Sequence, residues 1–292
     1  MTYVLDGKKV AQKLKNNLKI EIENLKLKFN CVPGLAVVQV GNVAASSVYV
    51  KAKTKAAKEV GINVIDHNLE ETTNQSELIN LISKLNSNRD VDGILVQLPL
   101  PDTINEEAVL NSILPEKDAD GFHPLNVGKL SISPKNDENL MIPCTPYGCL
   151  LLLRELDINL AGKNAVVIGR SNIVGKPMAQ LLLKESCTVT TVHSKTENIE
   201  SICRNADILV AAIGKPEFVN KDWVKDGAII IDVGINRIKV SETKSKLVGD
   251  VLFSDVEQKV SAISPVPGGV GPMTIACLLR NTTTACKLKY NN

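Results

Sequence analysis

Hydrophobic residues follow helical and strand patterns in turn along the whole chain. Apolar positions spaced three or four residues apart predict helices, and short continuous apolar runs predict strands. The expected elements of the first part are a helix through Val10, Leu14, Leu18, Ile22 and Leu25, strands at 35–40, 62–65 and 93–98, and helices at 44–60 and 77–85. Strands and helices that alternate in this way form parallel sheets covered by helices, so we expect an α/β fold.

A stretch rich in proline and glycine, residues 115–146, interrupts the alternation, and a second set of elements follows it. These are strands at 164–168, 188–192, 208–212 and 228–233, a helix at 174–183 and a last helix from 273 to about 286. We therefore predict two domains, each a mainly parallel sheet with flanking helices, with an active-site cleft between them. We assign residues 1–140 and the C-terminal helix 273–292 to one domain, and residues 141–272 to a second, Rossmann-like domain.

The composition narrows the class of protein. Basic and acidic residues number 34 and 32, and aromatic residues make up 3%, so neither a nucleic-acid partner nor a membrane surface is supported. The seven cysteines include no Cys-x-x-Cys pair, which favours buried thiols in a reducing compartment over disulfides or a metal site. The N-terminal residues lack a signal-peptide core and no apolar run is long enough to span a membrane, so we expect a cytoplasmic protein.

The segment 165–178 has the form of a buried strand, a tight turn and the start of a helix. Gly169 and Gly175 would let the backbone approach a phosphate at the positive end of the helix dipole. The spacing is Gly-x-Ser-x-x-x-Gly, so an ordinary strand-to-helix turn stays open as an alternative. The next strand ends in His193, Ser194 and Lys195 without a carboxylate, and Arg170 lies in the preceding turn. A cation with hydroxyl groups suits the 2′-phosphate of NADP, although His193 or Lys195 alone could be surface residues.

Lys53 is the most informative single residue of the helix at 44–60. At about 100° per residue it falls within the apolar arc, one turn after Tyr49, whereas Lys51, Lys55 and Lys58 lie on the opposite side. An inward-facing amine is desolvated, which favours its neutral form and suits proton transfer. The alternative is a lysine that reaches the surface with its ammonium group or pairs with a buried acid.

Two further segments carry polar residues where ligands bind in α/β folds. Gln97 ends an apolar strand and needs a partner, for which Lys53 is a candidate, although a backbone-capping amide is equally compatible with the pattern. Asp118, Asp120 and His123 lie in the interdomain stretch, where their simplest interpretation is turn formation.

The run Pro265–Thr274 contains three prolines and three glycines. Proline removes backbone donors and glycine is costly to order, so the run is not expected to form a regular helix or strand. We interpret it as a shaped loop that presents bare backbone to a ligand.

Together these segments resemble the bifunctional methylenetetrahydrofolate dehydrogenase/methenyltetrahydrofolate cyclohydrolase family, and the likeness runs in order over nearly the whole chain. The segments that carry it are Ser47–Lys53, Gly93–Leu100, Lys117–Pro124, Pro143–Gly148, Gly169–Pro177, Asp232–Asn236, Gly249–Val251 and Pro265–Thr274. Chance agreement of so many particular segments is implausible. The resemblance therefore disfavours the alternatives given above for the single segments.

The resemblance implies NADP-dependent oxidation of 5,10-methylenetetrahydrofolate to the methenyl form, followed by hydrolysis to 10-formyltetrahydrofolate. It gives Lys53 the handling of protons in the hydrolysis, with Tyr49 and Gln97 orienting it, and it makes Asp120 the acid that binds the pterin. The implied cofactor contacts are Gly169, Arg170, Ser171, Ser194 and Ile235. The implied folate-side loop is Pro267, Gly268, Gly269 and Val270.

The same resemblance makes the first domain the folate-binding catalytic domain and the second the NADP-binding domain. It also implies a homodimer. Two alternatives remain, a dehydrogenase without the hydrolytic step and a dinucleotide-binding sensor without turnover.

Overall fold

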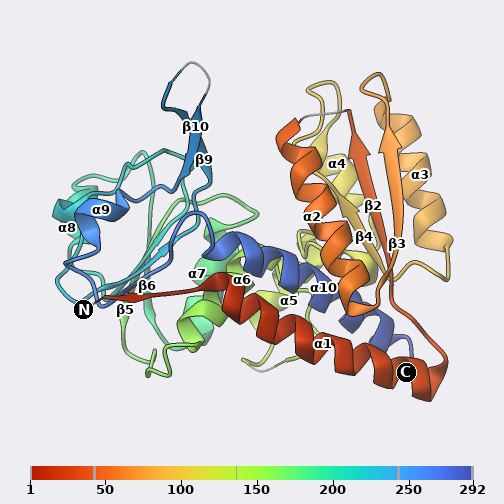
Figure 1. The fold of residues 1–292 in the computed structure, drawn as a ribbon, viewed down its shortest axis with the longest axis horizontal. Helices are drawn as coiled ribbons and strands as arrows, with labels where there is room; N and C mark the ends of the chain where they lie inside the picture. Colours follow the sequence, from red (N-terminus) through yellow and green to blue (C-terminus); the bar gives the residue numbers. More distant parts are fainter. Residues whose placement is uncertain (1, 42–43, 136, 242–243, 291–292) are drawn as a thin grey trace. The chain divides into compact units, whose positions relative to one another are not determined.

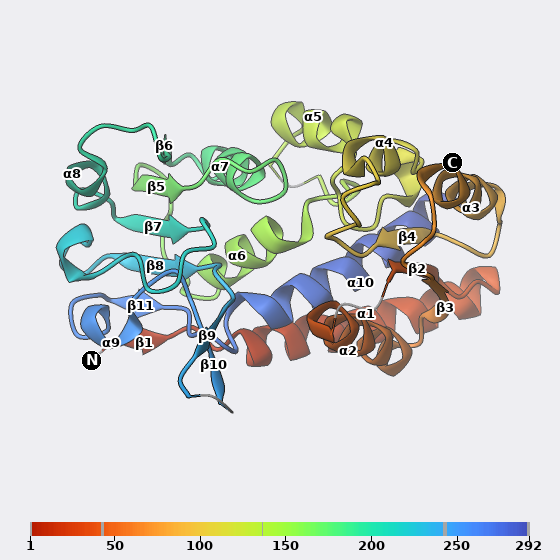
Figure 2. The ribbon, with the colours of Figure 1, turned by 90° about the horizontal axis from the view of Figure 1, so that it is seen from above.

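The computed structural model describes residues 2–41, 44–135, 137–241 and 244–290, and of residues 44–48 it describes the backbone alone. The chain forms two compact units, each made of two segments. The first unit contains residues 1–11 and 145–274, and the second contains residues 12–144 and 275–292. Figures 1 and 2 show the elements of both units. No helix among the described residues is both long enough and apolar enough to cross a bilayer.

A six-stranded, entirely parallel sheet forms the centre of the first unit. In spatial order its strands are β1 (Tyr3–Val4), β11 (Ala262–Ile263), β8 (Ile229–Asp232), β7 (Ile208–Ala211), β5 (Asn164–Ile168) and β6 (Thr188–Val192). The central strands are short runs of branched apolar residues, which suits a sheet buried on both faces. The first residues of the chain belong to this unit because β1 extends the sheet beside β11.

Helices and an antiparallel hairpin complete the first unit. They are α6 (Cys144–Arg154), α7 (Gly175–Lys184), α8 (Ile199–Cys203), the 3-10 helix η2 (Lys221–Trp223), α9 (Phe253–Val256), and the hairpin of β9 (Asn236–Lys239) and β10 (Ser245–Val248). Figure 1 shows the hairpin projecting from the rest of the unit. The periodicity did not predict the hairpin, because its strands are too polar to stand out from a loop.

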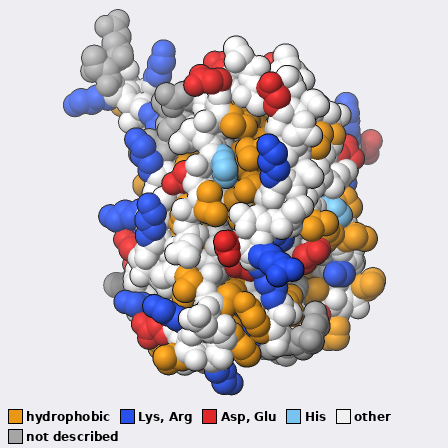
Figure 3. All heavy atoms as spheres, turned by 90° about the vertical axis from the view of Figure 1, so that its right-hand side faces the viewer, with side chains coloured by type: hydrophobic (Ala, Val, Ile, Leu, Met, Phe, Trp, Pro, Cys, Tyr) orange, Lys and Arg blue, Asp and Glu red, His pale blue; other side chains and the backbone are white. Residues whose placement is uncertain are grey.

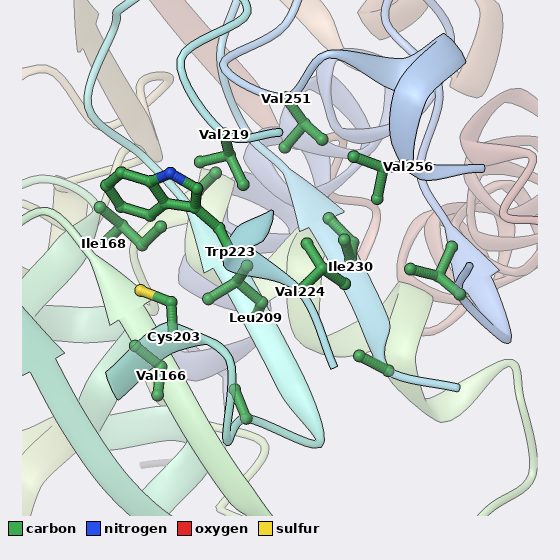
Figure 4. Packing of buried hydrophobic residues seen from close by; sticks show 14 of the residues in the cluster. Val166, Ile168, Cys203, Leu209, Val219, Trp223, Val224, Ile230, Val251 and Val256 are labelled. Carbon is green, nitrogen blue, oxygen red and sulfur yellow. The ribbon is translucent and has the colours of Figure 1, made fainter. Parts of the chain in front are cut away.

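The single tryptophan of the chain lies in the core of this unit (Figure 4). Trp223 is 5% exposed and packs with apolar side chains that include Ile168, Leu209, Val219 and Val251. Burial of such side chains is the main source of stability, at about 25 cal/mol per Å² of apolar surface.

A smaller parallel sheet forms the centre of the second unit, in the order β3 (Asn63–Leu69), β2 (Gly34–Val40) and β4 (Gly93–Val96). Its helices are α1 (Gly7–Phe29), which starts in the first unit, α2 (Ala44–Val60), α3 (Gln75–Ser87), α4 (Glu106–Asn111), the 3-10 helix η1 (Pro115–Lys117), α5 (Pro124–Ile132) and most of α10 (Val270–Leu288). Leu78 and Ile82 of α3 and Val109 of α4 pack in one apolar cluster with the sheet residues Val38 and Ile94. Basic and acidic side chains are interspersed over the face drawn in Figure 3.

Two proline-rich segments are more regular than their composition predicts. Residues 115–146 contain η1 and α5, which begin at Pro115 and Pro124. The last helix, expected from residue 273, already begins at Val270, so the irregular part of the run Pro265–Thr274 is shorter than expected. Proline is tolerated in the first turn of a helix, where its missing N–H would have no intrahelical partner.

A buried lysine that the sequence pattern did not single out secures the end of α3. Lys117 is 8% exposed, and its Nζ donates to the carbonyl oxygens of Leu85 (3.1 Å), Asn86 (2.8 Å) and Asn88 (2.7 Å). A cation at the C-terminus of a helix satisfies carbonyls that have no intrahelical donor. Burial lowers the pKa of this ammonium group, and Lys289 lowers it further.

Candidate functional site

The second unit holds the inward-facing lysine. Lys53 on α2 is 5% exposed, whereas Lys51, Lys55 and Lys58 on the same helix are exposed, as the helical period predicts. The Nζ of Lys53 donates to the Oε1 of Gln97 at 3.1 Å and lies 5.0 Å from the centroid of the Tyr49 ring. The structure therefore brings these three residues together.

Backbone contacts fix the orientation of Gln97. The residue directly follows β4, and its N–H extends the sheet by donating to the Val38 oxygen at 2.8 Å. Its side-chain Nε2 donates to the Leu98 oxygen at 2.6 Å. Because the amide nitrogen is engaged in this way, the Oε1 atom faces the Lys53 ammonium group.

Asp120 is half-buried in the same unit. Burial raises the pKa of its carboxyl to about 6, the charge of Asp118 adds to the rise, and the charge of Lys53 opposes it. Two contacts hold the backbone here: Cys144 N–H donates to the Asp120 oxygen at 3.2 Å, and Asn281 Nδ2 donates to the Ala119 oxygen at 2.9 Å. The Asp120 carboxyl group therefore interacts electrostatically with Lys53, and these two hydrogen bonds hold the backbone around it.

The neighbouring Asp118 and His123 shape the loop. Asp118 accepts hydrogen bonds from the backbone N–H groups of Gly121, Phe122 and His123 and from Asn126 Nδ2, at 2.8 to 3.2 Å. His123 caps α5, because its Nδ1 accepts from the Leu125 N–H at 3.2 Å. The turn-forming interpretation of these two residues accounts for their contacts.

The first unit holds the glycine turn after β5. Gly169 has φ +119°, and a Cβ built on it would lie 2.2 Å from the Ala212 oxygen, so only glycine fits. The Ser171 Oγ accepts from the N–H groups of Val174 (3.2 Å) and Gly175 (3.3 Å) at the start of α7. The turn therefore passes close to β7 and leads into a helix N-terminus.

A cavity of about 370 Å³ opens beside this turn. Its polar lining includes Arg170, Ser171, His193, Ser194 and Lys215, and its apolar lining includes Ile199, Ile213 and Phe218. Four of the five expected cofactor contacts, the exception being Ile235, line this cavity. Ile235 is 55% exposed.

Lys215 and Phe218 are cavity residues that the motifs did not single out. The Nζ of Lys215 lies 5.2 Å from the centroid of the Phe218 ring. Lys215 follows β7, and a polar residue after a strand of a Rossmann-like sheet is the signal that could have found it. No such signal marks Phe218.

Two buried carboxylates hold the loops at this end of the sheet. Asp250 is fully buried and accepts from the N–H groups of Ile213 (2.7 Å) and Gly214 (3.0 Å) and from Asn236 Nδ2 (2.9 Å). Asp232 accepts from the N–H groups of Gly234, Asp250 and Val251 at 2.9 to 3.0 Å. Burial raises the pKa of Asp232 to about 7, the charge of Asp250 adds to this rise, and the backbone donors oppose it.

The proline–glycine loop also lies in the first unit. Gly269 N–H donates to the Pro265 oxygen at 2.8 Å, and Gly268 has φ +108°. Pro267 is exposed, whereas Val270 is buried at the start of α10. The four residues expected on the folate side thus form the loop and the first helical residue after it.

Comparison with known proteins identifies the family. The sequence model of the tetrahydrofolate dehydrogenase/cyclohydrolase catalytic domain matches residues 5–120, and that of the NAD(P)-binding domain of the same family matches residues 143–290. The chain belongs to the tetrahydrofolate dehydrogenase/cyclohydrolase family.

Individual members of this family resemble the chain over almost its full length. The bifunctional protein FolD of Rhodospirillum rubrum is 53% identical over 98% of this chain and 98% of its own. The crystal structure of FolD from Campylobacter jejuni has a TM-score of 0.93 at 47% identity, covering 99% of this chain and 100% of its own. FolD of Trypanosoma brucei, solved with NADP and an inhibitor, has a TM-score of 0.94 at 39% identity, covering 100% of this chain and 99% of its own.

The expectations of a two-domain α/β fold and of a bifunctional enzyme of folate one-carbon metabolism are therefore confirmed. The protein is a methylenetetrahydrofolate dehydrogenase and methenyltetrahydrofolate cyclohydrolase, and the sensor and the dehydrogenase-only alternatives give way to it.

Proposed function

We propose that Lys53 is the proton-transfer residue of the cyclohydrolase reaction and that NADP is the hydride acceptor of the dehydrogenase reaction. The role of Lys53 is supported by the burial of its side chain and by the hydrogen bond that its Nζ donates to Gln97 Oε1 at 3.1 Å.

The hydrolysis adds water to the methenyl carbon of the folate, releases one proton and opens the ring to the 10-formyl product. The Lys53 Nζ, once it has given up a proton of its ammonium group, takes the proton from water as the oxygen bonds to that carbon. Gln97 Oε1 accepts a hydrogen bond from Nζ and so directs the remaining lone pair. The Tyr49 ring lies against the same group and limits its contact with solvent.

Folate binding is the role that we propose for Asp120 and for the loop from Pro267 to Val270. An ionised Asp120 accepts hydrogen bonds from N–H groups of the pterin, and it is ionised above a pH of about 6. Gly268 and Gly269 carry no side chain, so their backbone can approach a flat ligand closely.

The cavity in the first unit fits the phosphate-bearing end of NADP. Arg170, Lys215 and Ser194 offer cations and a hydroxyl group, and none of the described residues that line the cavity is acidic. NAD sites place a carboxylate against the ribose hydroxyls, and such a carboxylate would repel the 2′-phosphate of NADP. Gly169, Ser171 and the start of α7 form the phosphate side, and we assign Ile235 to the nicotinamide side.

When bound, NADP supplies the hydride acceptor, so the protein's part in this step is to align two planar ring systems. The carboxylates Asp232 and Asp250 contribute by fixing the loops that carry Ile213 and Gly234.

We assign the folate-binding residues Lys53 and Asp120 to the second unit, and NADP binding and the folate-side loop from Pro267 to Val270 to the first. The units differ from the division expected from sequence mainly at residues 1–11, which join the first unit through β1. A cytoplasmic location and a homodimer complete the proposal, and both rest on the family resemblance and the composition.

One assay with two readouts tests this function. Purified protein is mixed with 5,10-methylenetetrahydrofolate and either NADP⁺ or NAD⁺, and reduced cofactor and the methenyl chromophore are followed separately. We expect reduction of NADP⁺ and a decay of methenyl faster than the uncatalysed rate. A methenyl decay at the uncatalysed rate would refute the hydrolytic role.

The cofactor assignment has its own test in Arg170→Ala. Loss of this cation should raise the Kd for NADP⁺ at least tenfold, about 1.4 kcal/mol, and change the Kd for NAD⁺ little. Equal weakening for both cofactors would show that the 2′-phosphate is bound elsewhere.

A further inference from the structure

Two cysteines that lie far apart in sequence face each other in the second unit. The Sγ atoms of Cys31 and Cys286 are 2.9 Å apart. A disulfide bond measures about 2.05 Å, so the two sulfurs need to approach by less than about 1 Å to form one. The motifs of the dehydrogenase and cyclohydrolase sites include neither residue.

The two thiols come from the two different chain segments that build this unit. Cys31 follows α1 in the segment 12–144, and Cys286 lies in the last turns of α10 in the segment 275–292. Between them the chain leaves the unit and forms nearly all of the first unit. A covalent link at this point would close a loop of 255 residues, a length at which cross-links restrict the unfolded chain strongly.

Neighbouring contacts already hold the two segments in register. Lys287 Nζ pairs with Glu21 Oε1 at 3.1 Å, Lys289 Nζ pairs with Asp92, and the Phe29 and Tyr290 rings stack at 5.0 Å. These contacts follow directly after Cys286, at residues 287–290, and bind that end of the chain to α1 and to Asp92, so the sulfur pair is held in place.

Exposure differs between the two thiols and sets the order of reaction. Cys31 is half-buried, whereas Cys286 is fully buried. Burial and the hydrogen bond with Cys31 raise the pKa of the Cys286 thiol. A dissolved reagent therefore meets Cys31 first.

We propose that Cys31 and Cys286 form a reversible intramolecular disulfide that locks the C-terminal end of α10 to the chain after α1. The oxidant is a small-molecule disulfide of the glutathione type. The Cys31 sulfur attacks one sulfur of the oxidant and releases one small thiol. The Cys286 sulfur then attacks the Cys31 sulfur and displaces the second small thiol. Two protein thiols are oxidised, one small disulfide is reduced to two thiols, and the two protein protons pass to the released thiols.

Peptide mapping tests the link on the wild-type protein. The reduced protein is incubated with glutathione disulfide, remaining thiols are blocked with iodoacetamide, and the non-reduced digest is analysed by mass spectrometry. We expect the loss of two of the seven thiols and a peptide pair that joins Cys31 to Cys286. A lasting glutathione adduct on Cys31, a disulfide that uses other cysteines, or no loss of thiols would each overturn the proposal.

Thermal unfolding supplies the second measurement. Oxidation should raise the Tm of the wild-type protein by roughly 5 to 10 °C, and reduction should restore the original value. Cys31→Ser should abolish this shift, whereas Cys203→Ser, at a buried position in the first unit, should keep it. An equal shift in the Cys31→Ser protein would also overturn the proposal.

Discussion

Replacement of Asp250 by alanine should destabilise the first unit strongly, because the carboxylate is fully buried and accepts three hydrogen bonds. A hydrogen bond to a charged group contributes about 1.5–3 kcal/mol, and a buried donor without an acceptor costs about 1–3 kcal/mol. The Asn236 amide is half-buried and can turn to water, so the two backbone N–H groups carry most of the loss. We expect the free energy of unfolding to fall by about 3–5 kcal/mol for Asp250→Ala.

Asp250→Asn should cost less, about 1.5–3 kcal/mol, because its amide oxygen still accepts hydrogen bonds. In Asp250→Asn the new side-chain nitrogen can replace the oxygen that faces Asn236. The Asn236 amide can then rotate and accept a hydrogen bond from it with its own oxygen.

Urea unfolding followed by tryptophan fluorescence measures these losses in the relevant unit. Trp223 is the single tryptophan, and it is 5% exposed in the core that also contains Val251, next to Asp250. Asp226→Asn is the matched control, because Asp226 is a carboxylate of the same unit that is 89% exposed. An Asp250→Ala transition that shifts no further than that of Asp226→Asn would show that the buried carboxylate does not stabilise the unit.

Cofactor binding should weaken in the same protein, because Ile213, whose N–H donates to Asp250, lines the cavity. We expect the Kd for NADP⁺ to rise at least tenfold in Asp250→Ala, about 1.4 kcal/mol. An unchanged Kd would mean that the loop keeps its shape without the carboxylate.

Two further predictions concern the two ligands. Gly169→Ala should weaken NADP⁺ binding and lower the Tm, because its Cβ would lie 2.2 Å from the Ala212 oxygen; isothermal titration and thermal unfolding that match the wild type would contradict this. The KM for 5,10-methylenetetrahydrofolate should rise as the pH falls through about 6, where Asp120 takes up a proton, loses its charge and presents an O–H donor in place of one acceptor oxygen. An Asp120 of ordinary pKa would instead leave KM flat down to a pH near 5.

Periodicity was enough to predict the elements that have a strong apolar pattern. The expected bounds of the helix 44–60 and of the strands 164–168 and 188–192 are those of α2, β5 and β6. The burial of Lys53 followed from the same argument, because its place in the apolar arc depends only on the helical period.

Other features depend on partners that are distant in sequence. The strand β1 has two residues and exists because β11 lies beside it, and Lys117 is buried because the end of α3 presents three carbonyls to it. Asp232 and Asp250 are 18 residues apart, and no local pattern shows that one accepts from the backbone of the other. Local sequence could therefore indicate the burial of Lys53 but not the carboxylates that hold the loops beside the cavity of the first unit.

The most direct test of the proposed mechanism is Lys53→Met with both activities measured separately. Methionine keeps a long apolar side chain in the buried position and removes the amine that bonds to Gln97. Thermal unfolding that resembles the wild type would show that the fold is intact. We expect methenyl hydrolysis to fall to the uncatalysed rate while NADP⁺ and folate still bind. A Lys53→Met protein that hydrolyses methenyltetrahydrofolate at the wild-type rate would show that another group takes the proton from water.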